Sequence, residues 1–75
     1  MTAKGDAERA SAARARQRAK IMEIARDLAR SGWHADHTTI FRELEAIEGF
    51  SAARTQIDTP AFRAQLDKLC ARART

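Results

Sequence analysis

Two histidines and an aspartate lie close together in the middle of the chain, at His34, Asp36 and His37. Imidazole and carboxylate groups bind zinc, so these three residues are weak candidates for a metal site. Structural zinc normally takes four ligands from two separated pairs, and the single cysteine, Cys70, falls within an apolar helical pattern. We therefore expect no metal and no cofactor, with Asp36 capping a helix, His37 packing at its start and His34 exposed to solvent.

Positive charge is concentrated in the first twenty residues. They carry six cationic side chains against two acidic ones, a net charge of +4, whereas residues 21–75 carry eight of each sign. Lysine and arginine neutralise phosphates and release counterions without needing a fixed geometry, so this basic arm predicts binding to a nucleic-acid backbone. The candidate residues are Arg9, Arg14, Arg16, Arg18 and Lys20.

The basic arm has no large apolar side chain after its first residue, so it has nothing to bury in a core. Alanine and arginine favour a helix, but two like-charge pairs four residues apart each oppose it by about 0.2–0.5 kcal/mol. These pairs are Arg14 with Arg18 and Arg16 with Lys20. We expect residues 1–20 to be frayed or disordered when alone, and residues 21–75 to form a compact helical domain.

The composition of the whole chain predicts an all-α fold. The 75 residues include 17 alanines and 11 arginines but no valine or tyrosine, which favours helices over strands. Gly32 and Gly49 are typical of helix ends, and Thr59-Pro60 is typical of a helix start. We expect a small bundle of three main helices and one short helix, which follows Gly49.

Two finer expectations concern the residues that follow the glycines. Trp33 follows Gly32 and is expected to fold back over Leu28, as the residue after a left-handed helix cap often does. Ser51 is expected to cap the short helix.

A helix-turn-helix that reads the DNA major groove is a more specific alternative. It requires apolar residues at fixed distances from the glycine of its turn. With Gly49 in the turn of that motif, three of the positions that should be buried are polar. They are Glu45, Thr55 and Asp58. We therefore favour ordinary packed helices. A helix-based reader would require three further cations to share a surface with the arm, namely Arg42, Arg54 and Arg63.

The size of the chain limits its function. Seventy-five residues bury only about 60% of their unfolded surface, which leaves little room for an enzyme-sized cleft. We predict a non-enzymatic helical interaction module that binds a partner protein or itself. Met22, Trp33 and Phe41 are expected to be partly exposed and to anchor that surface. The alternative is a nucleic-acid-binding accessory protein that uses the basic arm.

The sequence also carries weaker indications about its location. No apolar run approaches the roughly 18 residues needed to cross a bilayer, and the N-terminus lacks the apolar core of a signal peptide. We expect no membrane association and a cytoplasmic location. The excess of arginine over lysine is typical of a GC-rich bacterial genome.

Overall fold

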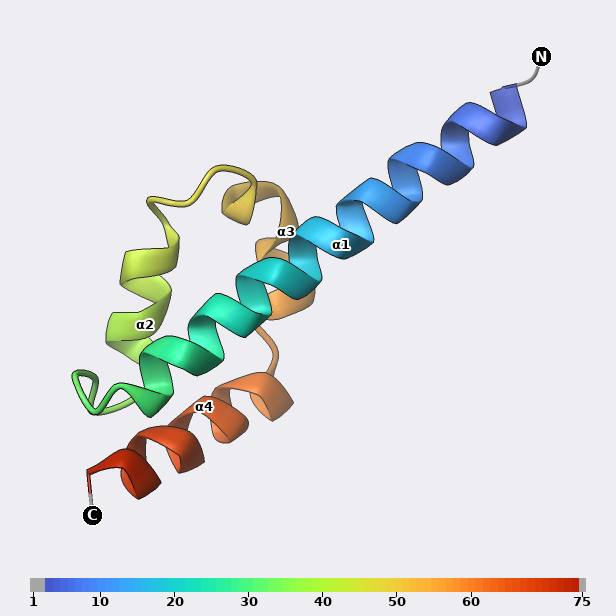
Figure 1. Ribbon diagram of the computed structural model, residues 1–75. Helices are drawn as coiled ribbons and strands as arrows, with labels where there is room; N and C mark the ends of the chain where they lie inside the picture. The colour runs from blue at the N-terminus through green and yellow to red at the C-terminus, as the bar shows by residue number, and fades with distance from the viewer. Residues whose placement is uncertain (1–2, 75) are drawn as a thin grey trace.

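The computed structural model describes the backbone of residues 3–74 and the side chains of residues 12–74. This part of the chain contains four helices and no strand, so the predicted all-α fold is confirmed (Figure 1). The helices are α1 (Ala3–Arg30), α2 (His37–Leu44), α3 (Phe50–Ile57) and α4 (Pro60–Ala73). Their lengths differ from the expected three main helices and one short one, because α2 has only eight residues, the same as α3.

Helix α1 joins the predicted arm to the first helix of the predicted domain without a break. Its many alanines and arginines are strong helix formers, and its 28 residues span about 42 Å at 1.5 Å per residue. The helix ends at Arg30, and Gly32 then takes a left-handed φ of 81°. Ser31 closes this end, since its Oγ donates to the Leu28 carbonyl and accepts a hydrogen bond from the Trp33 N–H.

The connection between α2 and α3 comprises residues 45–49, and α3 begins at the glycine that ends it. Asp36 caps α2 as predicted, because its carboxylate accepts a 2.9 Å hydrogen bond from the Thr38 N–H. Residues 45–49 form turns, and Gly49 has a left-handed φ of 91°. This residue is itself the N-cap of α3, with its carbonyl accepting from Ala53. The prediction that Ser51 caps α3 is therefore wrong, since Ser51 lies inside the helix.

Helix α4 begins as its sequence predicts. Thr59 has an extended backbone, with φ −114° and ψ 154°, as expected for a residue before proline. Its hydroxyl accepts a 3.2 Å hydrogen bond from the Phe62 N–H, and Pro60 occupies the first turn.

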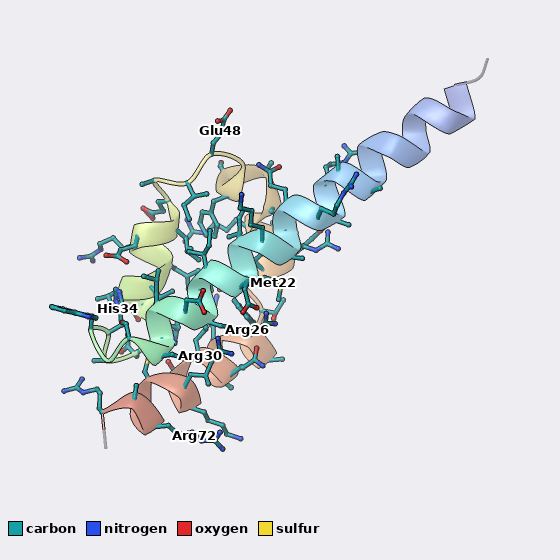
Figure 2. The ribbon with its side chains drawn as sticks, in the orientation of Figure 1. Met22, Arg26, Arg30, His34, Glu48 and Arg72 are labelled. Carbon is teal, nitrogen blue, oxygen red and sulfur yellow. The ribbon has the colours of Figure 1, made fainter. Side chains whose placement is uncertain are left out.

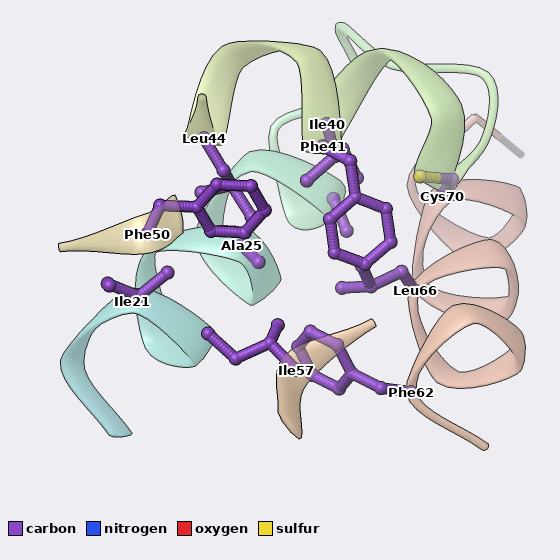
Figure 3. Packing of buried hydrophobic residues seen from close by; sticks show 11 residues of the cluster. Ile21, Ala25, Ile40, Phe41, Leu44, Phe50, Ile57, Phe62, Leu66 and Cys70 are labelled. Carbon is purple, nitrogen blue, oxygen red and sulfur yellow. The ribbon is translucent and has the colours of Figure 1, made fainter. Parts of the chain in front are cut away.

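All four helices contribute to one hydrophobic core (Figure 3). Its buried members are Ile21, Ala25, Ala29, Ile40, Phe41, Leu44, Phe50, Ile57, Phe62, Leu66 and Cys70. The ring of Phe41 lies 6.2 Å from that of Phe50 and 6.5 Å from that of Phe62, within the range of favourable aromatic contact. The contribution of α1 begins only at Ile21, which agrees with the absence of large apolar residues before it.

The molecule is elongated, with extents of 55 × 20 × 19 Å. The N-terminal part of α1 projects beyond the other three helices, while α1 and α4 end at the same side of the molecule (Figure 1). At that side, a Cβ on Gly32 would lie 3.5 Å from the Ala73 carbonyl. None of the helices in the described residues combines the length and apolar character needed to span a membrane.

Candidate functional site

The N-terminal part of α1 carries cations that no other described residue neutralises. Arg14, Arg16 and Lys20 are exposed, and none of them forms an ion pair or hydrogen bond with another described residue. Arg9 lies within α1 but outside the described side chains. The candidate phosphate-binding residues of the arm are thus on one helix, and three of them have no partner among the described side chains.

Of two other arm residues, one contacts the turn before α3 and the other contacts α3 itself. Gln17 donates from Nε2 to the Glu48 carbonyl at 3.1 Å, and Arg18 donates from Nη1 to the side-chain oxygen of Gln56. Arg18 precedes Ala25 by seven residues, two helical turns, so it lies on the face of α1 that packs on the core. This spacing was visible in the sequence, whereas the positions of its partners on α3 were not.

A depression of about 200 Å³ lies between α1 and α3. Small residues of α3 form one side, and two arginines of the arm stand at the other. The lining residues are Arg14, Ala15, Gln17, Arg18, Gly49, Ala52, Ala53 and Gln56.

A second depression, of about 280 Å³, is lined by the three arginines that a helix-based DNA reader would need on one surface with the arm. Its lining residues are His37, Thr38, Phe41, Arg42, Glu45, Arg54, Asp58 and Arg63. The arginines come from α2, α3 and α4. The three arginines therefore lie together, but not with the arm, whose residues line the first depression on the other side of α3.

Asp58 orients two of these arginines. Its carboxylate accepts a hydrogen bond from Arg63 Nε and forms a 3.8 Å ion pair with Arg54 Nε. The hydrogen bond from Arg63 is the main reason that the pKa of Asp58 is lowered, against the opposing effect of burial. Arg42 forms no ion pair or hydrogen bond with another described residue. The depression is lined by three guanidinium groups and by the carboxylates of Asp58 and Glu45, so its net charge is positive.

Almost every carboxylate among the described side chains is occupied by an internal partner. Four of them pair with arginines, two contact histidines, and one caps α2. The carboxylates that pair with arginines are Glu23, Asp27, Glu45 and Asp58. Those that contact histidines are Glu43 and Asp67, and Asp36 caps α2. Glu48 is the exception, and it points away from the body (Figure 2). The free donors of the arm are therefore not matched by free carboxylates on the body.

The three weak candidates for a metal site make separate contacts. His34 is buried, so its expected exposure to solvent is wrong; its Nδ1 lies 2.8 Å from Thr39 Oγ1 and its Nε2 lies 3.2 Å from Glu43 Oε2. His37 contacts Asp67 through Nδ1 at 2.9 Å, and Asp36 caps α2. Within the described residues, no three His, Cys, Asp or Glu side chains are grouped to hold a metal ion.

The predicted interaction surface is only partly exposed. Trp33 has 87% of its surface exposed, so the expectation that it folds back over Leu28 is wrong; it is the one large hydrophobic side chain exposed in the described part of the chain. Met22 is half-buried against the core. Phe41 is only 6% exposed, because it packs between two other aromatic rings, so its expected exposure is also wrong.

The three polar residues that conflict with a helix-turn-helix register do not enter the core. Glu45 and Thr55 are exposed, and Asp58 lies in the second depression. No protein-family model, no curated protein and no solved structure matches this chain.

Proposed function

We propose that this chain is a non-enzymatic accessory protein that binds nucleic acid through the phosphate backbone, using the cations of the arm. The observation that carries this proposal is that Arg14, Arg16 and Lys20 have no partner among the described side chains, while nearly all described carboxylates of the body have internal partners. Cations without an internal partner can neutralise phosphates without first breaking an ion pair.

The placement of these cations supports the same function. The arm projects beyond the other helices, so a long polyanion can approach it without meeting the body (Figure 1). Arg16 and Lys20 lie one helical turn apart and line neither depression, so they face outward together. Because phosphate contacts carry no base information, we expect little sequence preference from the arm itself.

The salt dependence of binding tests this function. A double variant, Arg16→Gln with Lys20→Gln, removes two phosphate contacts, so the slope of log affinity against log salt should fall by about 2. The charge-matched control is Lys68→Gln with Arg74→Gln, on α4 and at its C-cap. Fluorescence anisotropy with a labelled duplex between about 50 and 200 mM salt gives both slopes. Equal slopes for the two variants, or no binding at low salt, would contradict the proposal.

A second candidate function is protein contact at Trp33, as the apolar surface of an interaction module. Its 87% exposure favours this, because tryptophan is enriched among the residues that dominate interface energies. A second copy of the chain is the partner that can be tested directly. Sedimentation equilibrium should then show a dimer that Trp33→Ala weakens at least tenfold. A chain that remains monomeric at the highest soluble concentration would contradict self-association.

A further inference from the structure

Helix α3 forms a ridge between the two arginine-lined depressions. Its buried side chains, Phe50 and Ile57, fix one face against the core. Ser51, Ala52 and Thr55 lie on the opposite face and are exposed. The outward face of α3 is therefore narrow and made of small side chains.

The two sides of this ridge carry positive charge from different helices. On one side lie Arg14 and Arg18 of α1, and on the other lies the group formed by Arg42, Arg54 and Arg63. Arg18 and Arg63 each contact one side chain, while Arg54 contacts two carboxylates and the Phe50 ring, which limits the directions in which their remaining N–H groups can donate. A guanidinium has five N–H donors, so these contacts still leave donors for an anion.

We infer that α3 enters the major groove of duplex DNA and that the arginines on its two sides contact the phosphates of the two flanking strands. This inference rests on the proposed function, since it names the kind of nucleic acid and the surface that meets it. It adds a second contact region to the arm, built from α2, α3 and α4.

The dimensions of the groove select DNA over RNA. The major groove of B-form DNA is about 12 Å wide and admits a helix, whereas the major groove of A-form RNA is too narrow and deep. Small outward side chains let the backbone of α3 approach the base edges closely. The hydroxyls of Ser51 and Thr55 can donate to or accept from either kind of base pair, so they fit a groove without strong sequence choice.

The C-terminal end of the arm lies beside α3. Gln17 contacts the Glu48 carbonyl just before α3 and Arg18 contacts Gln56 near its end, while the rest of the arm continues outward from there (Figure 1). Arg14 and Arg18 line the depression beside α3, whereas Arg16 and Lys20 lie on the opposite face of α1. A duplex lying over α3 therefore passes close to Arg14 and Arg18, and the outward cations of the arm form a separate contact region.

The decisive test places one negative charge on the ridge. Thr55→Glu should weaken binding to a short DNA duplex by about tenfold or more, because the new carboxylate would face the base edges and the flanking phosphates. Gln65→Glu is the matched control: it adds the same charge at an exposed position on α4 that lines neither depression. Circular dichroism checks that both variants fold.

A second pair of variants tests the far side of the ridge. Arg42→Gln should weaken binding by about three- to tenfold and lower the salt slope by about 1, whereas Lys68→Gln should change affinity less than twofold. The inference is overturned if Thr55→Glu matches Gln65→Glu and Arg42→Gln matches Lys68→Gln while the arm variant still lowers the salt slope. In that case the arm binds phosphates without help from α3, and the proposed function stands. Absence of binding by the unaltered protein would contradict both the inference about α3 and the proposed function.

Equal affinities for DNA and RNA duplexes, with Thr55→Glu affecting both alike, would also overturn the inference, because α3 cannot enter the A-form major groove.

Discussion

At the scale of single residues, Gly49 meets two demands at once. Its φ of 91° is in the left-handed region, where a side chain costs about 1–2 kcal/mol. In addition, a Cβ at this position would overlap the side-chain amide of Gln17, which crosses over the glycine to reach the Glu48 carbonyl. The turn before α3 and the contact between α1 and α3 therefore depend on the same missing side chain.

Replacing Gly49 should cost more than replacing the other left-handed glycine. We expect Gly49→Ala to lower the free energy of unfolding by about 2 kcal/mol and Gly32→Ala by about 1 kcal/mol, because only the first also displaces a neighbour. Urea unfolding followed by circular dichroism measures both. In a Gln17→Ala background, the loss caused by Gly49→Ala should fall to that caused by Gly32→Ala. Equal losses for the two single variants would show that the Gln17 contact is not the cause.

At the scale of helices, the ends were predictable and the contacts between helices were not. Gly32, Asp36 and Thr59-Pro60 act through their own backbone conformation and nearest N–H groups, so local sequence is enough to place them. The exposure of Trp33 and the burial of Phe41 depend on neighbours far along the chain. The arm was recognisable from its charge, but the three arginines of the second depression come from three helices and meet only in the folded chain.

One such contact joins α2 to α4 through Asp67. Its carboxylate accepts hydrogen bonds from both the backbone N–H and the ring of His37, each at 2.9 Å. Burial alone would raise the pKa of Asp67, but these hydrogen bonds and the charge of His37 outweigh it, so the pKa is lowered from 3.8.

A lowered carboxyl pKa makes stability depend on acid. The contribution of Asp67 is complete above the unfolded value of 3.8 and is lost as the pH falls through the lower folded value. The urea midpoint should therefore fall between about pH 5 and pH 2. In Asp67→Asn the protein should be less stable at pH 7, and its midpoint should fall less with acid. Glu48→Gln, at a carboxylate without a partner, is the control. An unchanged acid profile in Asp67→Asn would contradict this account.

At the scale of the whole molecule, a single small core supports 75 residues. Domains of this size are stable by about 4–11 kcal/mol in total. None of the described side chains of the arm belongs to the core, whose buried members all lie between Ile21 and Cys70.

A single cavity in this core should remove a large part of the stability. We expect Leu66→Ala, at a fully buried position, to cost about 2–5 kcal/mol and to lower the melting temperature by more than about 10 °C. Leu69→Ala, at a partly buried position on the same helix, should cost clearly less. Thermal unfolding followed by circular dichroism compares them, and similar melting temperatures would contradict the described core.

The exposure of Trp33 also determines how this protein can be observed. It is the single tryptophan of a chain without tyrosine, and it already faces water in the native state. Its emission should therefore change little when the core melts, so fluorescence will miss an unfolding transition that circular dichroism records. The same indole will shift to shorter wavelength when another molecule covers the loop between α1 and α2, which gives this end of the protein its own optical reporter.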